Sequence, residues 1–244
     1  MKLMKFLPNL LTLFNLLSGS IAVVCAVNNQ IQFTVFFVVL GVFFDFFDGF
    51  VARILNVQSE LGKQLDSLAD MVTSGLVPGI VMTQMLLRAS GSKPLIFVDT
   101  IPYFALLGFC ITLASCYRLA NFNIDIHQTE NFIGLPTPAN TLLILSIALM
   151  KVSKGYAYVN FLFDYKYSLV LLTFLSCYLL NANIKLFGLK FKNFVFVGNE
   201  LKYVFILVSI LFILVLKLAA LPAIIVLYVV LSMIKNILDS KVQG

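Results

Sequence analysis

Charge is scarce in this sequence. Only 11% of its 244 residues are Asp, Glu, Lys or Arg, whereas 61% are hydrophobic, and the mean hydropathy is +1.01. A soluble domain carries roughly 25% charged residues, so the composition excludes that class of protein. Because the apolar residues extend along the whole chain, we expect one polytopic membrane domain over residues 1–244, not a soluble domain with an anchor.

Histidine and paired cysteines are also scarce. His127 is the one histidine, and the four cysteines lie in apolar runs without a CxxC pair. We interpret the cysteines as buried packing residues and His127, in a polar loop, as a solvated side chain. The basic residues form no stripe interleaved with aromatics, so the net charge of +6 predicts no nucleic-acid partner. They are expected to set topology and to meet anionic headgroups of membrane lipids.

Long apolar runs are what the sequence has instead. Eight segments are long enough to cross a bilayer, at 8–27, 31–50, 67–87, 95–119, 136–152, 166–184, 201–216 and 219–237. We therefore predict an all-α fold with about eight transmembrane helices, the first of them an uncleaved span. With the N-terminus in the cytoplasm, eleven Lys and Arg lie on that side and six on the other, which favours this orientation.

Four of the eight aspartates lie between positions 45 and 70. Asp45 and Asp48 end the second apolar segment, and Asp66 and Asp70 begin the third. Residues three or four apart share one face of a helix, so each pair presents two carboxylates on one side. Because a short connection joins the two segments, we expect the four carboxylates to face one another.

Four converging carboxylates repel one another, and a divalent cation removes that repulsion. Carboxylate oxygens without histidine or thiolate partners favour hard ions such as Mg²⁺, Mn²⁺ or Ca²⁺. An enzyme and a divalent-cation transporter are both compatible with intramembrane aspartates. Transporters usually hold such groups at the membrane midplane within two similar halves. Here the aspartates lie at segment ends and no second half repeats them, which favours the enzyme.

The spacing of these residues resembles a known family. The segment reads Asp45-x-x-Asp48-Gly49-x-x-Ala52-Arg53, then eight residues, then Gly62-x-x-x-Asp66-x-x-x-Asp70. Every fixed position is similar to the motif of the CDP-alcohol phosphotransferases. The resemblance implies two Mg²⁺ or Mn²⁺ ions that hold the pyrophosphate of a CDP-linked donor. It implies four metal ligands, which are Asp45, Asp48, Asp66 and Asp70.

The resemblance also implies roles for the neighbours of the metal ligands. Asp70 is expected to act as the general base for the acceptor hydroxyl. The CDP-binding set is expected to be Asn9, Thr12, Asp45, Gly49, Ala52, Arg53 and Gly62. Asn9 and Thr12 share a face of the first helix and could hydrogen-bond the nucleotide, or could serve only as polar contacts between helices.

Four stretches resemble one branch of this family, the membrane-embedded phosphatidylserine synthases. They are residues 8–19, 64–79, 118–123 and 132–139. The likeness covers the first 145 residues, so we expect a core at 1–145 and additional helices at 146–244. It implies transfer of a phosphatidyl group from CDP-diacylglycerol to L-serine, an active site facing the cytoplasm at the cell membrane, and a homodimer. Glycerol 3-phosphate, choline and an inositol phosphate are alternative acceptors.

Two basic residues are candidates for binding the acceptor. Arg118, at the end of the fourth segment, could make a bidentate contact with the carboxylate of serine. It could equally be a positive anchor at the cytoplasmic face. Lys63 lies beside the aspartate motif and could contact phosphate, or could extend to the headgroups as a topological lysine.

Overall fold

The computed structural model describes residues 2–97, 102–124, 132–188 and 199–242, and His127 lies outside them. The chain is almost entirely helical, which confirms the predicted all-α class. Its elements are α1 (Lys2–Val27), α2 (Ile31–Ile54), α3 (Glu60–Asp70), the π-helix η1 (Met71–Leu76), α4 (Val77–Ala89), η2 (Leu95–Phe97), η3 (Tyr103–Phe109), α5 (Cys110–Ile124), β1 (Phe132–Ile133), α6 (Thr137–Val152), α7 (Ala157–Phe163), α8 (Lys166–Asn181), β2 (Lys185–Leu186), α9 (Glu200–Leu216), η4 (Lys217–Ala219) and α10 (Ala220–Val242).

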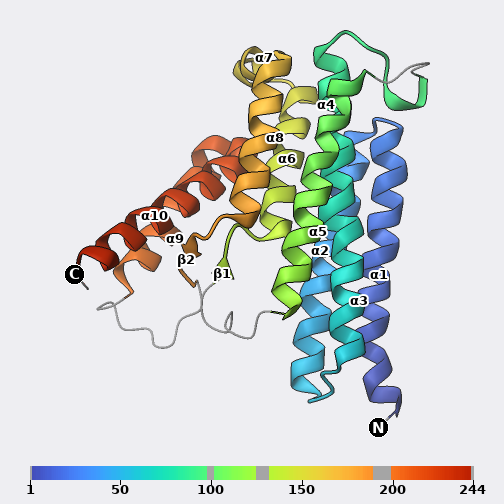
Figure 1. Cartoon of the computed structure of the whole chain (residues 1–244), viewed down its shortest axis with the longest axis vertical. Helices are drawn as coiled ribbons and strands as arrows, with labels where there is room; N and C mark the ends of the chain where they lie inside the picture. The colour runs from blue at the N-terminus through green and yellow to red at the C-terminus, as the bar shows by residue number, and fades with distance from the viewer. Residues whose placement is uncertain (1, 98–101, 125–131, 189–198, 243–244) are drawn as a thin grey trace.

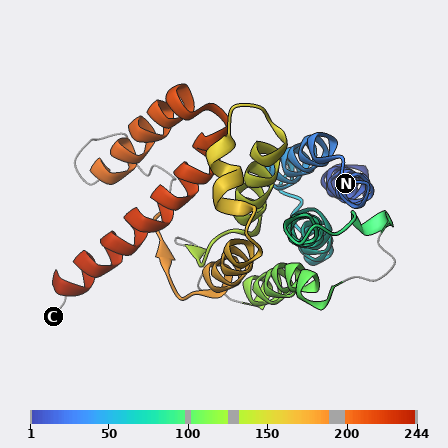
Figure 2. The same ribbon diagram turned by 90° about the horizontal axis from the view of Figure 1, so that it is seen from above.

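The main body is a bundle of helices that run along the long axis of the molecule (Figure 1). Helices α3, η1 and α4 form one continuous rod. Seen from above, this rod lies inside the bundle and α1, α2, α5, α6 and α8 surround it (Figure 2). The ends of α1, α2 and α3 extend beyond α6 and α8 at the end of the molecule that holds the N-terminus (Figure 1).

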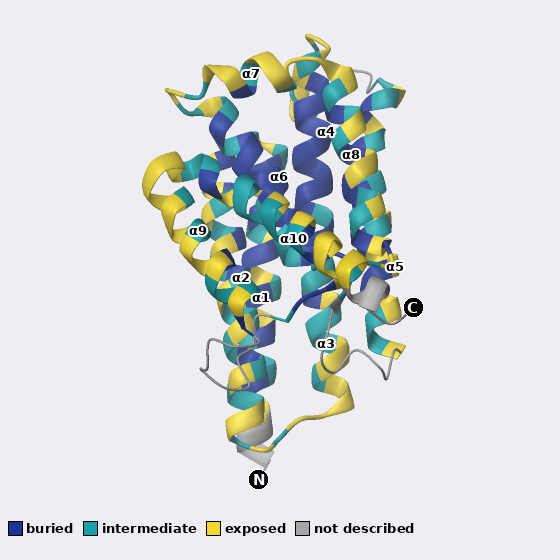
Figure 3. Ribbon diagram, turned by 90° about the vertical axis from the view of Figure 1, so that its left-hand side faces the viewer, coloured by how far each residue is buried: buried dark blue, intermediate teal, exposed yellow. Residues whose placement is uncertain are grey.

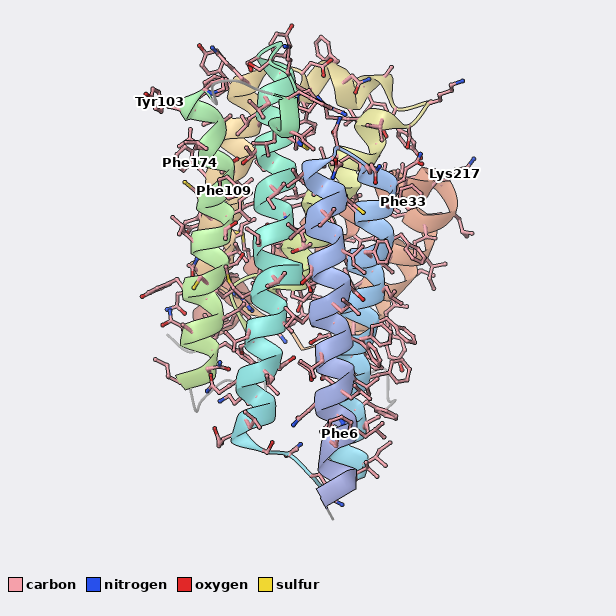
Figure 4. All side chains as sticks on the ribbon, turned by 90° about the vertical axis from the view of Figure 1, so that its right-hand side faces the viewer. Phe6, Phe33, Tyr103, Phe109, Phe174 and Lys217 are labelled. Atoms are coloured by element: carbon pink, nitrogen blue, oxygen red, sulfur yellow. The ribbon has the colours of Figure 1, made fainter. Side chains whose placement is uncertain are left out.

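Helix α4 is the centre of the core because it is apolar on all sides. Each of its residues from Val77 to Leu87 is buried, and Figure 3 shows α4 and much of α6 in the colour of buried residues. The outer helices instead carry large apolar side chains that point away from the bundle. Phe6, Phe33 and Phe174 are examples (Figure 4), and each is more than half exposed. Such an apolar exterior is the surface that lipid tails cover.

The number of spans differs from the predicted eight. Five helices of the described chain are long and apolar enough to cross a membrane, or six if α6 and α7, bent by 115°, form one broken span. Helix α8 has 16 residues and reaches about 24 Å, short of the roughly 30 Å hydrocarbon core. The last two predicted segments form the stretch Glu200–Leu238, which is broken at Lys217 by a positive φ of 52°.

The turn between α2 and α3 sets the position of the aspartate-bearing helices. Asn56 adopts a left-handed conformation with φ of 50°, one that Asn tolerates better than most residues. Ser59 then caps α3, since its hydroxyl oxygen accepts a hydrogen bond of 3.1 Å from the backbone N–H of Gly62. This N-cap begins α3 so soon after α2 that the acidic residues of the two helices reach the same level, while α1 packs against both helices.

A short strand pair joins the start of α6 to the end of α8. Phe132 pairs with Leu186 and Ile133 with Lys185 in antiparallel register. Gly134 follows with φ of +72°, and a Cβ added there would lie 2.5 Å from the carbonyl oxygen of Leu180. Glycine is therefore required at this position both by its backbone angle and by the lack of space.

Replacing Gly134 tests this contact against a matched control. Gly91 has the same φ of +72° but nothing within 4 Å of an added Cβ. Both Gly→Ala variants bear about 1–2 kcal/mol of backbone strain, and Gly134→Ala adds overpacking of about 1–3 kcal/mol. We expect Gly134→Ala to lower the thermal unfolding midpoint of the detergent-purified protein clearly more than Gly91→Ala. Equal midpoints for the two variants would contradict the proposed close packing.

Candidate active site

Three carboxylates from two helices converge at the extended end of the bundle. Asp45 and Asp48 come from the last turns of α2, and Asp66 comes from α3. One carboxylate oxygen of each lies within 4.8 Å of the others. Asp48 is buried, and the other two are partly buried. The structure thus brings together three of the four aspartates that the sequence analysis places in one site.

Asp70 lies next to this group without belonging to it. It is the last residue of α3, and its side chain interacts with that of Asp45. One of its oxygens accepts a hydrogen bond of 3.2 Å from the side-chain amide of Asn15 on α1. Asp70 therefore has a protein donor on one oxygen, whereas the other three aspartates form the compact group.

The compact group has the features of a hard-cation site. Its donors are all carboxylate oxygens, and Asp66 Oδ1 is buried without a hydrogen-bond partner among the described residues. The ion pair found in the described chain joins Lys151 to Asp164, so the aspartates have no such basic partner there. Buried carboxylates need a compensating positive charge. The chemistry of this donor set therefore fits Mg²⁺ or Mn²⁺, whose preferred ligands are oxygens.

Helix α1 supplies polar side chains to the same site. The Thr12 hydroxyl donates a 2.5 Å hydrogen bond to Asp48 Oδ2, and Thr12 itself is buried. A hydroxyl that donates to a carboxylate keeps its lone pairs available for another donor. The contact shows that α1 packs directly against the aspartate-bearing end of α2.

A cavity of about 710 Å³ opens beside Asp48 and Asp66. Its walls include all the predicted CDP-binding residues except Asp45, namely Asn9, Thr12, Gly49, Ala52, Arg53 and Gly62. The nearest atom to a Cβ added at Gly49 is a terminal nitrogen of Arg53, 3.9 Å away. The space beside this glycine is therefore open, as binding of a bulky group requires.

Lys63 also lines this cavity, but its ammonium group has a protein partner. It donates a 2.5 Å hydrogen bond to the carbonyl oxygen of Asn123 near the end of α5. The side chains of Ser67 and Asn123 are joined as well, with contacts of 2.8 and 3.1 Å. These bonds fasten α5 to α3 one residue away from Asp66. Sequence reasoning missed this role of Ser67, because its partner lies 56 residues further along the chain.

Arg118 lies in a second, separate cavity of about 320 Å³. The residue is only 8% exposed, and its Nε has no hydrogen-bond partner among the described residues. Its charge lies close enough to Asp70 for the two to interact. The amide groups of Asn121 and Asn181 share the cavity. A buried guanidinium with an unused donor is suited to hold an anionic group.

Asn181 is a residue of this cavity that the sequence did not reveal. Its side-chain nitrogen donates to the carbonyl oxygens of Ala114 and Cys177, at 3.1 and 3.3 Å. The bond to Ala114 fixes the amide against α5, the contact with Cys177 lies within α8, and the amide oxygen stays available. Asn181 follows Arg118 at a long distance in sequence, and only the packing of α8 on α5 brings them together.

Comparison with known proteins agrees with this site. A model of the CDP-alcohol phosphatidyltransferase family matches residues 5–175. The CDP-diacylglycerol–serine O-phosphatidyltransferase of Bacillus subtilis is 34% identical over 146 residues, which are 59% of this chain and 76% of the relative. The enzyme of the same name from Saccharomyces cerevisiae is 32% identical, over 62% of this chain and 55% of the relative. The archaetidylserine synthase of Methanothermobacter thermautotrophicus is 30% identical, over 59% of this chain and 58% of the relative.

These relatives differ in how much of their length is matched. The chain spans about three quarters of the length of the Bacillus subtilis relative and little more than half of the length of the yeast and archaeal relatives. The family match, however, includes α1 through most of α8 and so all the site residues described above except Asn181. Because it covers well over half of the sequence, the chain belongs to the CDP-alcohol phosphatidyltransferase family.

Proposed function

We propose that this protein transfers the phosphatidyl group of CDP-diacylglycerol to the hydroxyl group of L-serine, forming phosphatidylserine and releasing CMP. The observation that carries the proposal is the group of three carboxylates within 4.8 Å of one another at the wall of the 710 Å³ cavity. Support for the acceptor comes from the relatives, several of which are named as serine phosphatidyltransferases.

Asp45, Asp48, Asp66 and Asp70 are the proposed ligands of two Mg²⁺ or Mn²⁺ ions. When bound, these ions neutralise the pyrophosphate and make CMP a better leaving group. The chain supplies the remaining contacts to the donor. Arg53 faces the cavity and binds phosphate oxygens, while the open side of Gly49 admits the nucleotide.

Asn9 and Thr12 contact the cytosine or the ribose in this proposal. Both line the cavity from α1. Thr12 donates its proton to Asp48, so it can meet the nucleotide only as an acceptor. Gly62 and Ala52 complete the wall, where larger side chains would fill the space that the nucleotide needs.

Asp70 is the proposed general base. It takes the proton of the serine hydroxyl as the serine oxygen attacks the β-phosphorus in line, and the bond from that phosphorus to the CMP oxygen breaks. A position beside the three-carboxylate group, not inside it, suits this role. One oxygen of Asp70 is held by Asn15, which leaves the other to receive the proton.

Arg118 is the proposed partner of the serine carboxylate. The charge of Arg118 lies close enough to that of Asp70 for the two to interact. The Asn121 and Asn181 amides offer oxygen acceptors for the ammonium group of serine. Lys63 is held by Asn123 and would contact the acceptor only as a second, weaker cation.

The wider setting of the enzyme is part of the same proposal. We place the active site at the cytoplasmic face of the cell membrane, with the acyl chains of CDP-diacylglycerol remaining among membrane lipids. Residues 1–145 are the proposed catalytic core, 146–244 supply additional helices, and the enzyme works as a homodimer. Serine arrives from the cytoplasm.

The choice of acceptor can be tested by CMP release from CDP-diacylglycerol micelles with Mg²⁺ or Mn²⁺. We expect release with L-serine and none above background with glycerol 3-phosphate, choline or an inositol phosphate. Asp70→Asn should lower the serine-dependent rate by about 10²–10⁴-fold, the usual contribution of a general base. CMP release with another alcohol would identify that alcohol, instead of serine, as the acceptor. No CMP release from folded protein would favour the divalent-cation transporter.

Metal binding can be tested separately from catalysis. Asp48→Asn should weaken Mn²⁺ binding by about 10- to 100-fold or more. Loss of a residue that only orients a metal ligand already costs that much, and Asp48 is itself a proposed ligand. Binding is measured by electron paramagnetic resonance of free Mn²⁺ in detergent-purified protein. Asp164→Asn is the control, because Asp164 is 65% exposed and paired with Lys151. Unchanged Mn²⁺ affinity in Asp48→Asn would contradict the proposed ligand set.

Binding of the serine carboxylate can be tested at Arg118. Arg118→Gln should raise KM for serine by about 10- to 100-fold, which corresponds to the loss of a charged hydrogen bond. KM for CDP-diacylglycerol should change little, because Arg118 lies outside the larger cavity. Arg88→Gln, at the opposite end of α4 from the aspartates, serves as the control. An equal rise in both KM values would indicate a structural role for Arg118 instead.

A further inference from the structure

A chain of hydrogen bonds leads from the π-helix to Asp70 through α1. Asn15 on α1 and Thr73 in η1 are both fully buried. The Asn15 side-chain nitrogen lies 3.2 Å from Asp70 Oδ1, and its side-chain oxygen lies 2.8 Å from the Thr73 hydroxyl. Asn15 thus connects two positions of the α3–η1 rod that are three residues apart.

The polarity of this chain follows from the chemistry of its members. A carboxylate only accepts hydrogen bonds, so the amide of Asn15 must present its NH₂ group to Asp70. Its oxygen then faces Thr73, and the Thr73 hydroxyl must donate. The backbone oxygen of Asn15, 3.3 Å from the same hydroxyl, is a second acceptor and favours the same direction. The proton of Thr73 therefore reinforces the orientation in which the NH₂ group of Asn15 faces Asp70.

The packing around Thr73 holds it in place. A Cβ added at Gly19 of α1 would collide with Thr73 Oγ1. A Cβ added at Gly41 of α2 would lie 2.8 Å from Thr73 Cγ2 and 2.9 Å from Asn15 Oδ1. Because Gly19 and Gly41 have no side chains, they leave the space that Thr73 occupies between α1 and α2. A threonine that only filled this space would not need its hydroxyl within hydrogen-bond distance of the Asn15 side chain.

The local helix geometry also sets this segment apart. The π-helix begins at Met71, the residue that follows Asp70, and ends at Leu76. Single π-helical turns inside longer helices are rare and occur frequently at functional sites. Here the widened turn lies between the proposed base and the buried helix α4, and Thr73 is part of it.

We propose that Asn15 and Thr73 are positioning residues for Asp70. The Thr73 hydroxyl orients the Asn15 amide, the amide binds Oδ1 of Asp70, and the direction of Oδ2 toward the metal and the acceptor hydroxyl is fixed as a result. Neither residue touches substrate. The inference rests on the proposed function for the role of Asp70, but the hydrogen-bond chain does not depend on which alcohol is the acceptor.

The hydroxyl of Thr73 can be removed without changing its shape. Thr73→Val is nearly isosteric and lacks the donor, whereas Thr73→Ser retains it. Thr173→Val is the matched control, because Thr173 is equally buried and its hydroxyl bonds the carbonyl oxygen of Leu169 in its own helix. Asn15→Leu removes the middle of the chain, and the thermal unfolding midpoint of each purified variant identifies any that fail to fold.

Two measurements, kcat for CMP release and the affinity for Mn²⁺, distinguish a positioning role of Thr73 from a role in packing alone. We expect Thr73→Val to lower kcat for CMP release by about 10- to 100-fold, the usual cost of losing a partner that orients a ligand, with KM for CDP-diacylglycerol within about twofold. Without substrate, the same variant should bind Mn²⁺ about 10-fold more weakly. Thr73→Ser and Thr173→Val should behave as the wild type in both measurements.

The proposal is overturned if Thr73→Val keeps the wild-type kcat and Mn²⁺ affinity, or if Thr73→Ser loses as much as Thr73→Val. A comparable loss in Thr173→Val would also overturn it, because any buried hydroxyl would then have the same effect. The Mn²⁺ affinity, measured without substrate, tests this inference independently of the proposed function. Protein that shows no serine-dependent release, yet loses Mn²⁺ affinity in Thr73→Val and retains it in Thr73→Ser, would reject the acceptor and support the positioning role.

Discussion

The concentration of negative charge inside an apolar bundle is the constraint on which the rest of this structure depends. Three carboxylates share a space of less than 5 Å, one of them buried and two partly buried, where repulsion between charges is stronger than in bulk water. Two of them are held in place by different means. Thr12 donates to Asp48, and the Ser67–Asn123 contact secures the helix that carries Asp66. The fold therefore uses hydrogen bonds between helices to oppose a repulsion that a bound cation removes.

Much of this site could be predicted from the sequence because its spacing is local. The intervals between Asp45 and Asp48, and between Asp66 and Asp70, are helical intervals, and the short connection between α2 and α3 lets carboxylates of the two helices face one another. The all-α class followed equally from the apolar runs. Asn9 and Thr12 share a face of α1, but their place at the nucleotide was expected only from the family resemblance; both line the larger cavity.

What could not be predicted depends on contacts between distant segments. Asn181 reaches the cavity of Arg118 only through the packing of α8 on α5, and no pattern near Asn181 indicates this. The π-helix is equally hidden, because Met71–Leu76 reads as ordinary helical sequence. The number of spans was uncertain for another reason. Hydropathy detects apolar segments but not bends, such as the 115° angle between α6 and α7.

The two cavities are built from different parts of the chain. Apart from Phe122, the walls of the larger one come from α1 to α3 and the connection between α2 and α3. The smaller one is formed by α5, the end of α8 with Ala182 that follows it, and Ile133 of β1. The residues that line the smaller cavity can therefore change without replacing any residue in the wall of the larger one. Under the proposed function, such a division lets enzymes for new acceptor alcohols evolve through changes in the smaller cavity, while the residues proposed to bind the CDP-linked lipid are retained.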